Sequence, residues 1–326
     1  MKCLVTGGAG FIGSHLTEKL VKLGHKVIVL DNLSTGKISN LNKVKSKIKF
    51  FKVDLSLSEK KISKYFKKVD WVFHLAGLAD IVPSILNPNK YFDSNVKSTL
   101  NVLEASRKSK IKKFIYSASA SCYGIPKNFP TKEDSKIDPK NPYALTKFIG
   151  EQMVIHWANV YKMPNISLRF FNVYGPRSQT TGAYGSVFGV FLAQKLANKP
   201  MTIVGNGQQT RDFIYISDLV NAVTKVASSK KVCEIYNVGS GTEVKIKKIA
   251  KLLKGVTTNI PKRPGETGRS LADISKMKRT FNWSPKISIA KGIKELLQQI
   301  QTWKGAPIWT PSKINKVTKV WFKYIK

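Results

Sequence analysis

A tyrosine and a lysine, four residues apart, form the clearest candidate for acid–base chemistry in this sequence. If the segment that follows Asn141-Pro142 is helical, Tyr143 and Lys147 lie on the same helical face, one turn apart. A tyrosine is a poor base at its ordinary pKa of about 10. A nearby ammonium group favours the phenolate and lowers that pKa. The pair therefore predicts a tyrosine that can exchange a proton with a substrate hydroxyl.

Serine side chains precede this pair at the end of a run that is typical of a strand. Ser117, Ser119 and Ser121 alternate along the segment from Tyr116 to Gly124, and their hydroxyls can bind a substrate oxygen. A tyrosine–lysine pair alone is most often an ordinary feature of a helix surface. Its combination with the serine segment favours an active site.

A glycine-rich turn near the N-terminus predicts a binding site for a dinucleotide. Gly7 allows a tight turn after a strand, Gly10 lets the backbone approach a pyrophosphate, and Gly13 lets helix and strand pack closely. A second strand ends at Asp31, about 20 residues further on. Its carboxylate would accept hydrogen bonds from the adenosine ribose and repel a 2′-phosphate, so the sequence predicts NAD and not NADP.

The elements that must position these groups follow from the hydrophobic pattern of the first half of the chain. The predicted strands are Lys2–Thr6, Lys26–Leu30, Lys49–Val53, Trp71–Leu75, Lys113–Ser117 and Ile166–Phe170. The predicted helices between them are Ser14–Lys22, Asn95–Ser109 and Tyr143–Tyr161. This alternation predicts an α/β fold with a Rossmann-type, doubly wound parallel sheet.

The pattern becomes looser after about residue 175, where strands are short and loops are long. Helices are predicted at Ser217–Ala227, Ile246–Leu253 and Ile289–Thr302. We expect residues 1–175, with later crossover segments at about 205–235, to form the NAD-binding domain. Residues 176–302 would mainly form a smaller α/β substrate-binding domain at the C-terminal edge of the sheet, where ligands of such folds bind, and residues 303–326 a helical tail.

In the order of its motifs, the sequence resembles the extended short-chain dehydrogenases/reductases. Within them it is most similar to NAD-dependent nucleotide-sugar epimerases and dehydratases, above all the UDP-glucose and UDP-N-acetylglucosamine 4-epimerases. The resemblance covers roughly residues 2–300. Besides the glycine turn, the serine run and the Tyr143/Lys147 pair, it rests on Asp54-Leu55, His74–Gly77, Asn95, Arg169–Arg177, Gly205–Gly207, Arg211–Phe213 and Arg263–Gly265.

The resemblance implies roles for individual residues. It implies that Ser119, Tyr143 and Lys147 are the catalytic group. Around NAD it implies Gly7, Gly10, Phe11, Ile12, Gly13, Asp31, Asn32, Asp54, Leu55, Leu75, Ala76, Gly77, Asn95, Tyr143, Lys147 and Phe170. Around a nucleotide sugar it implies Ser119, Ser121, Tyr143, Asn172, Arg211, Arg263 and Ser270. Arginines and an amide suit a pyrophosphate.

The two residues after Ser119 bear on the type of reaction. In the dehydratases of this family an Asp–Glu pair follows the catalytic Ser or Thr, and many decarboxylases keep the Glu. Here these positions are Ala120 and Ser121, so the acid–base group that elimination needs is missing there. We therefore expect 4-epimerisation of a UDP-sugar through a transient 4-keto sugar. A decarboxylase, dehydratase or C4 reductase remains the alternative within the family.

Ser270 bears on the substrate, because it stands seven positions after Arg263 of the Arg-Pro-Gly turn. In the family's epimerases that position lies beside the C2 substituent of the sugar, where a small residue admits an N-acetyl group. We expect a UDP-N-acetylhexosamine as substrate, with or without a plain UDP-hexose. The alternative is that the loop length differs and Ser270 points to solvent.

The net charge of +37, from 56 Lys and Arg against 19 Asp and Glu, raises the question of an anionic partner. The lysines are spread along the whole chain without a nucleic-acid-binding motif, which favours a solvated basic surface. A non-catalytic NAD- or RNA-binding protein is the alternative from another class. Of the seven arginines, five fall in segments that we expect to line a phosphate-bearing site: Arg169, Arg177, Arg211, Arg263 and Arg269.

Several features predict a cytoplasmic enzyme. No run of about 18 apolar residues suggests a membrane span, and the N-terminus runs straight into a strand without a signal segment. Cys3, Cys122 and Cys233 are scattered, so neither a disulfide framework nor a zinc or other metal site is indicated. The resemblance implies a homodimer formed through the helices at about Tyr91–Ser109 and Tyr143–Tyr161, and use of the product in polysaccharide biosynthesis.

The C-terminal tail predicts an amphipathic helix with Ser312 as its N-cap. Ile314, Val317, Val320, Trp321 and Tyr324 recur at helical spacing among lysines. Such a helix can lie on an anionic membrane surface or dock its apolar side on the enzyme or on a dimer partner. Because the apolar stripe is short and two prolines fix its approach, we expect docking.

Overall fold

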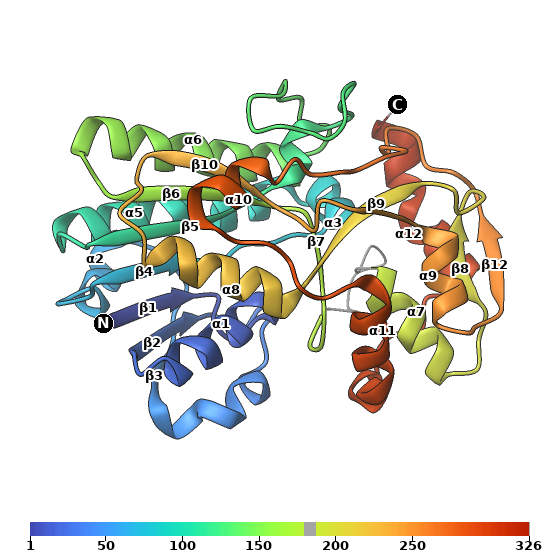
Figure 1. The fold of residues 1–326 in the computed structure, drawn as a ribbon, viewed down its shortest axis with the longest axis horizontal. Coiled ribbons are helices and arrows are strands. Elements are labelled where there is room, and N and C mark those ends of the chain that lie inside the picture. The colour runs from blue at the N-terminus through green and yellow to red at the C-terminus, as the bar shows by residue number, and fades with distance from the viewer. Residues whose placement is uncertain (179–186, 326) are drawn as a thin grey trace.

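A seven-stranded parallel sheet forms the centre of the molecule in a computed structural model that describes residues 1–178 and 187–325 (Figure 1). Its strand order is β10-β6-β5-β4-β1-β2-β3, so the order reverses between β1 and β4. Ligands of open α/β sheets bind at such a reversal, beyond the carboxyl ends of the strands. The strands are β1 (Lys2–Thr6), β2 (Lys26–Asp31), β3 (Ile48–Lys52), β4 (Trp71–His74), β5 (Lys113–Ser119), β6 (Asn165–Phe170) and β10 (Glu234–Val238). The predicted fold class is confirmed.

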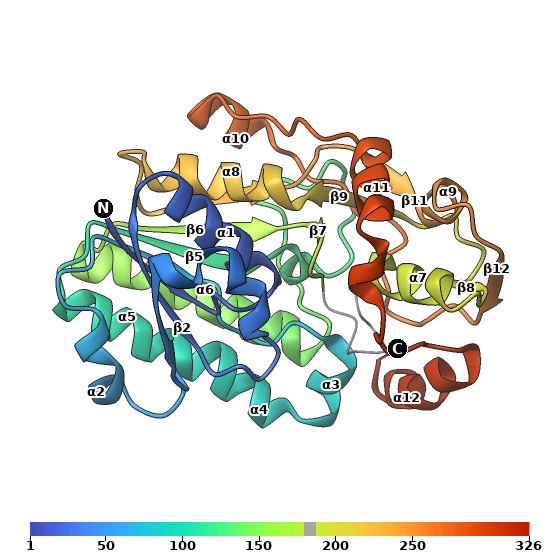
Figure 2. The same ribbon diagram turned by 90° about the horizontal axis from the view of Figure 1, so that it is seen from below.

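Helices cover both faces of this sheet (Figure 2). On one face lie α1 (Phe11–Lys22) and α8 (Ile216–Ala227), and on the other α5 (Ser98–Lys108) and α6 (Pro142–Tyr161). Successive strand residues point to opposite faces, so Leu4 belongs to one buried core and its neighbour Val5 to the other. Strands that are buried on both faces explain why the sequence reads as continuous apolar runs.

The smaller part of the molecule lies beyond the carboxyl ends of the strands. A three-stranded sheet has the order β11-β9-β7, and a two-stranded sheet pairs β12 with β8. These strands are β7 (Asn172–Tyr174), β8 (Met201–Val204), β9 (Thr210–Tyr215), β11 (Glu243–Lys245) and β12 (Thr257–Ile260). The helices here are α7 (Val187–Leu196), α9 (Ile246–Leu252), α11 (Ile289–Gln298) and α12 (Pro311–Tyr324), whereas α10 (Ser275–Phe281) packs against β10 of the large sheet.

Short helices and turns complete the chain. The remaining α-helices are α2 (Glu59–Ile62), α3 (Ile81–Leu86) and α4 (Pro88–Phe92). Residues Ile38–Lys47, Ser63–Tyr65, Ala120–Tyr123 and Ile300–Trp303 are 3-10 helical, and Asp93–Lys97 form a π-helical turn that leads into α5. Among the described residues, no helix is both long and apolar enough to cross a membrane.

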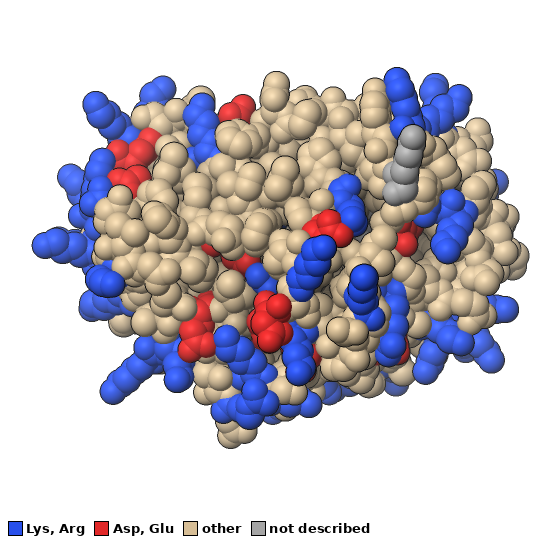
Figure 3. Space-filling model, turned by 90° about the horizontal axis from the view of Figure 1, so that it is seen from above, with Lys and Arg blue, Asp and Glu red and all other residues tan. Residues whose placement is uncertain are grey.

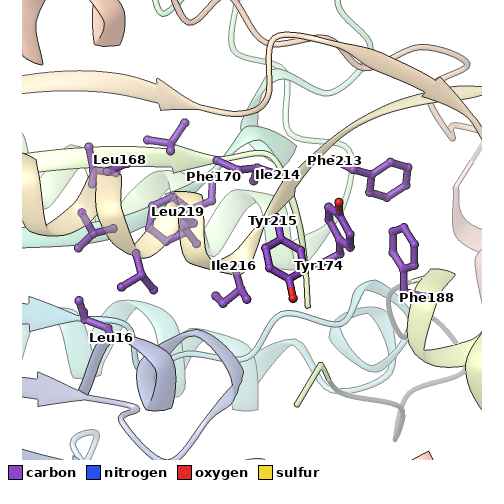
Figure 4. Close-up of a cluster of buried hydrophobic side chains, with 14 of the residues drawn as sticks. Leu16, Leu168, Phe170, Tyr174, Phe188, Phe213, Ile214, Tyr215, Ile216 and Leu219 are labelled. Carbon is purple, nitrogen blue, oxygen red and sulfur yellow. The ribbon is translucent and has the colours of Figure 1, made fainter. Parts of the chain in front are cut away.

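One continuous core joins the large sheet to the smaller part (Figure 4). Leu168 and Leu219 fill the space between sheet and helix, and the cluster continues through β9 to Tyr174 and Phe188. The rings of Tyr174 and Phe188 are stacked with their centroids 4.5 Å apart. Such aromatic pairs add to the stabilisation that comes from burial alone. The core therefore fixes β7 and β9, which carry candidate substrate residues, against the sheet that carries the cofactor turn.

Most predicted elements appear within a few residues of their expected bounds, but the tail helix begins earlier than expected. Its N-cap is Thr310, whose hydroxyl accepts a hydrogen bond from the Lys313 amide at 3.4 Å, and the predicted cap Ser312 lies inside the helix. Pro311 occupies the first helical position, where its missing N–H breaks no helical hydrogen bond. The prediction that this tail docks on the enzyme's own body is confirmed, because α12 packs against α3.

The basic side chains are widely spread over the surface. On the face shown in Figure 3, Lys and Arg stand mainly around the margin and among acidic side chains, and they do not gather in one patch. Long charged side chains keep their charged ends in water at such positions. The distribution on this face is that of a solvated basic surface.

Candidate active site

The glycine turn has the geometry that close approach of a phosphate requires. Gly7 has a φ of 67°, and a Cβ at this residue would lie 2.8 Å from the Cα atom of Ala76, in the loop that follows β4. A Cβ at Gly13 would overlap the carbonyl oxygen of Gly7. Gly10 is the N-cap of α1, so the free N–H groups of that helix face outward at the carboxyl end of β1. The residues present therefore fit the pyrophosphate of a dinucleotide.

A cavity of about 800 Å³ extends from this turn across the carboxyl ends of the strands. It is large enough for a dinucleotide-sized ligand. The predicted cofactor residues that line it are Gly7, Gly10, Phe11, Ile12, Gly13, Asp31, Asn32, Asp54, Leu55, Leu75, Ala76, Gly77, Tyr143, Lys147 and Phe170.

Asn95 is the one predicted cofactor residue that lies behind this cavity wall. It is fully buried, and its amide accepts from the Leu78 N–H at 2.8 Å and donates to the Leu78 carbonyl and the Thr146 hydroxyl at 3.0 Å. A Cβ at Gly77 would lie 2.8 Å from the Asn95 Oδ1 atom. Asn95 therefore fixes the Gly77–Leu78 backbone against α6. Gly77 and Leu78 line the first cavity, so Asn95 positions the part of the cavity wall that faces the cofactor.

Backbone amides hold the carboxylate at the end of β2. Asp31 accepts hydrogen bonds from the Ala9 N–H at 2.9 Å and from the Leu33 N–H at 2.8 Å. Burial nevertheless raises the pKa of this carboxyl group, against the effect of both hydrogen bonds. Nearby, the Asn32 amide donates to Asp54 at 3.4 Å. The acidic group is thus immobile at the end of the cavity where an adenosine ribose is expected.

The serine, tyrosine and lysine of the candidate catalytic group lie together. The Tyr143 hydroxyl donates to the Ser119 Oγ atom at 3.1 Å, and the Ser121 hydroxyl donates to the same atom at 2.8 Å. The Ser121 N–H also donates to the Ser119 Oγ atom, at 3.2 Å. Three donors therefore meet at one hydroxyl oxygen, in a network that a substrate oxygen can join. The Lys147 Nζ atom lies 4.4 Å from the centre of the Tyr116 ring, a distance at which an ammonium interacts with the ring face.

Burial controls the protonation of this group. It raises the pKa of the Tyr143 hydroxyl, although hydrogen bonds with Ser119 and Ser121 act in the opposite direction. It lowers the pKa of the Lys147 ammonium to about 7. The sequence led us to expect that Lys147 lowers the pKa of Tyr143; in the protein alone, desolvation raises this pKa, and the groups that act against it are the Ser119 and Ser121 hydroxyls. A positive charge added beside Tyr143 acts toward the phenolate.

A second cavity of about 350 Å³ adjoins the first, and Ser119 and Tyr143 line both. The predicted substrate residues that line the second cavity are Ser119, Ser121, Tyr143, Asn172, Arg211 and Ser270. Arg263 does not line it: its buried side chain lies 3.8 Å from the Glu266 carboxylate, which itself lies 2.8 Å from Arg211. The structure thus brings Arg211, Arg263 and Glu266 together at one end of this cavity.

Two arginines that we expected near a phosphate serve other purposes. Arg169 is buried and donates to the Glu151 carboxylate through Nε and Nη2, to the Tyr123 hydroxyl and to the Glu133 carbonyl. Arg177 pairs with Glu18 on α1 and donates to Ser14 at 3.1 Å. The expectation is wrong for these two arginines, because neither lines either cavity and an acid distant in sequence binds each guanidinium.

Two residues near the candidate catalytic group were missed by the sequence reading. Asp80, at the start of α3, lines the first cavity, and burial raises the pKa of its carboxyl group. Trp321, on the tail helix, lines the second cavity. A signal for Asp80 existed in its closeness to the His74–Gly77 motif. Nothing local identifies Trp321, because its position depends on where the tail packs.

Fold and site together define a class of protein. A glycine turn after the first strand, an acid that ends the second, and a Ser–Tyr–Lys group beside the same cavity are the parts of a short-chain dehydrogenase/reductase. Enzymes of this class bind a nicotinamide dinucleotide and act on a carbon that bears a hydroxyl group.

Comparison with known families narrows this class. Residues 3–239 match the NAD dependent epimerase/dehydratase family, and the chain belongs to this family of NAD-dependent enzymes. A relative described as a putative UDP-glucose 4-epimerase, from Methanocaldococcus jannaschii, is 36% identical over 301 residues, which are 90% of this chain and 96% of the relative.

Solved structures agree with this assignment. The UDP-glucose 4-epimerase of Thermotoga maritima, solved with UDP-glucose, has a TM-score of 0.87 and 33% sequence identity, covering 94% of this chain and 99% of its own. The UDP-N-acetylglucosamine 4-epimerase of Methanobrevibacter ruminantium, in complex with UDP-N-acetylmuramic acid, has a TM-score of 0.85 and 33% identity, covering 91% of this chain and 98% of its own.

Proposed function

We propose that this enzyme catalyses the 4-epimerisation of a UDP-sugar. The observation that carries the proposal is the position of Tyr143 and Ser119, which are hydrogen-bonded at 3.1 Å and line both cavities. A sugar hydroxyl that reaches this pair from the second cavity meets the nicotinamide end of the first. The identity of the relatives, which include UDP-glucose and UDP-N-acetylglucosamine 4-epimerases, supports a UDP-sugar as substrate.

The residues of the chain divide the proton chemistry between them. Tyr143 takes the proton of the C4 hydroxyl and later returns it, and the Ser119 hydroxyl holds the same oxygen by a hydrogen bond without losing its proton. Lys147 binds the nicotinamide ribose and supplies positive charge behind Tyr143. NAD, when bound, supplies the acceptor that removes and returns the C4 hydride. The 4-keto sugar turns in the second cavity between the two half-reactions.

The surroundings of Ser119 support epimerisation over elimination. Ala120 and Ser121 follow it, and the Ser121 hydroxyl is held by the Ser119 Oγ atom at 2.8 Å. Elimination requires an acid–base group that reaches the carbons beside C4. Of the described carboxylates, Asp80 lines the first cavity, and Glu266, which lines the second, is paired with Arg211 at 2.8 Å.

The charge and the size of the second cavity support a nucleotide diphosphate sugar as substrate, with its C2 group beside a small residue of the protein. We propose that Arg211 and Asn172 bind the diphosphate directly, and that Arg263 adds its charge from behind Glu266. Ser270 lines the cavity and leaves room for an N-acetyl group. UDP-N-acetylglucosamine and its galacto isomer are therefore the proposed substrates, alongside UDP-glucose.

The proposal is tested by incubating the protein with NAD and a panel of UDP-sugars. Products are followed by NMR and mass spectrometry. An epimerase converts a UDP-hexose or UDP-N-acetylhexosamine into an isomer of unchanged mass without accumulation of NADH. Loss of carbon dioxide or water from the sugar, or net reduction of NAD, would replace the proposal with another reaction of the family.

We also propose that residues 1–175, with later crossover segments, bind NAD, and that two chains pair through α5 and α6. Val102, Leu103 and Val154 of these helices belong to the core. Leu100, Leu145 and Val160 remain exposed on the same helices, which supports a paired surface. Light scattering after gel filtration tests this, and a monomeric mass would exclude the dimer.

The three free thiols support a location in a reducing compartment, the cytoplasm.

A further inference from the structure

The tail helix α12 returns to the large part of the molecule and packs against α3 (Figure 2). Its buried residues are Ile314, Thr318, Trp321 and Ile325. Tyr324, expected in the apolar stripe, is 62% exposed, and Thr318 takes a stripe position because its hydroxyl donates to the Ile314 carbonyl at 2.8 Å. The buried positions thus recur every three or four residues, one helical turn apart, along one side of the helix.

Trp321 is the residue through which this helix reaches the second cavity. It is 2% exposed and packs with Val82 of α3 and with Ile325. Its indole Nε1 donates to the Pro264 carbonyl at 2.7 Å. The residues on either side of that carbonyl are Arg263 and Gly265, and Gly265 and Glu266 line the cavity together with Trp321.

We propose that α12 is one wall of the substrate pocket, and that Trp321 positions the Arg263–Glu266 turn for the nucleotide sugar and limits the shape of what enters. The inference rests on the proposed function, because it names a determinant of the same pocket. Trp321 connects two sides of that pocket, α3 with Ile81 on one side and the Arg-Pro-Gly turn on the other. Its size therefore sets the distance between them.

The chemistry of the side chain supports this role. The only polar atom of the indole is already engaged by Pro264, so the ring offers carbon atoms to the cavity. An apolar ring face suits the C–H groups of a pyranose, whereas Arg211, which lines the same cavity, suits the charged end of the substrate. Because Trp321 does not line the first cavity, a change at this residue acts on the substrate and not on NAD.

The test compares Trp321→Phe and Trp321→Ala with Tyr324→Ala, which removes an exposed aromatic ring from the same helix. Each full-length variant is measured for melting temperature, for the Kd of NAD and of UDP by calorimetry, and for kcat and KM on the UDP-sugars that the unsubstituted enzyme converts. Trp321→Phe keeps a buried ring and loses the hydrogen bond, so it tests positioning in a folded protein.

We expect Trp321→Ala to weaken UDP binding and raise KM about tenfold or more, and Trp321→Phe to do so by a smaller factor, with kcat changed less than KM. The Kd of NAD stays the same in both, and Tyr324→Ala matches the unsubstituted enzyme. The inference is overturned if both Trp321 variants keep the original KM and UDP affinity, or if NAD affinity falls as much as UDP affinity. If the unsubstituted protein itself binds no UDP-sugar, the proposed function is wrong, and the inference about Trp321 is wrong as well.

Discussion

The Tyr143 hydroxyl and the Ser119 Oγ atom lie 3.1 Å apart at the junction of the two cavities. Tyr143 comes from the first turn of α6, where Asn141 caps the helix by accepting from the Ala144 N–H at 2.9 Å. Ser119 is the last residue of β5. The distance between the two hydroxyls is therefore fixed by the packing of α6 on β5, which makes the pair sensitive to changes in either element.

Replacing Tyr143 with Phe removes the proton-transfer group and leaves the ring. We expect kcat to fall about 100-fold or more, as for the loss of a positioned acid–base group, with NAD affinity unchanged. Tyr161→Phe, at the exposed end of the same helix, is the matched control and should keep full activity. Steady-state kinetics and NAD titration measure both. Near-normal turnover by Tyr143→Phe would remove Tyr143 from the mechanism.

Lys147 should make the free energy of unfolding of the NAD-free protein rise with pH above about pH 7. Burial lowers its pKa to about 7 from an ordinary value of 10.5, so above pH 7 the unfolded chain binds the proton that the folded protein releases. Stability therefore rises with pH through this window, by up to about 1.4 kcal/mol per pH unit. Urea unfolding of the unsubstituted protein and of Lys147→Met at pH 7, 8 and 9 measures it. The slope should be smaller in the variant, and equal slopes would show that Lys147 stays charged in the fold.

Asp31 should make the enzyme discriminate against NADP. A 2′-phosphate beside this buried carboxylate meets like charge, which predicts at least about tenfold weaker binding of NADP than of NAD. Asp31→Asn should reduce the ratio. Asp54→Asn removes the same charge from the same cavity and should leave it unchanged. Equal affinity of the unsubstituted protein for both dinucleotides would show that Asp31 does not face the ribose.

Ser270 should decide whether an N-acetyl group enters the second cavity. Ser270→Tyr fills the space that this small residue leaves, so activity on UDP-N-acetylhexosamines should disappear while activity on UDP-hexoses remains. Ser270→Ala keeps the space and should accept both. The measurement is kcat/KM for each substrate. Unchanged N-acetyl turnover by Ser270→Tyr would contradict the pocket assignment.

The buried pair of Arg169 and Glu151 should contribute strongly to stability. Their side chains are 3% and 1% exposed, and Glu151→Gln leaves the Arg169 charge without its counter-ion. We expect a loss of about 3–5 kcal/mol in the free energy of unfolding. Asp138→Asn breaks the exposed pair with Lys140 and should change it by less than about 1 kcal/mol. A similar small effect of both substitutions would show that Arg169 finds another partner.

The sequence predicted those features that depend on neighbours in the chain. The strands, the glycine turn and the position of Asp31 follow from spacing and composition over short segments, and the Tyr143/Lys147 pair follows from helical periodicity. Features that depend on distant partners were missed. Arg169 looked like a phosphate ligand because its carboxylate partner, Glu151, lies on another element. Trp321 was expected only as part of the apolar stripe of a docked tail, because its place at the cavity depends on the packing of α12 on α3.

The place of β10 in the sheet determines how late the large sheet can be completed while the chain is being synthesised. Glu234–Val238 pair with β6, yet they follow β7, β8, β9 and α8 in the chain. During synthesis from the N-terminus, the outer edge of β6 stays unpaired until residue 238 has emerged. An open edge of that kind can pair with other chains. The nascent protein therefore needs this edge protected for longer than its N-terminal position suggests, and the NAD-binding part closes only after β7, α7, β8 and β9 of the smaller part have been synthesised.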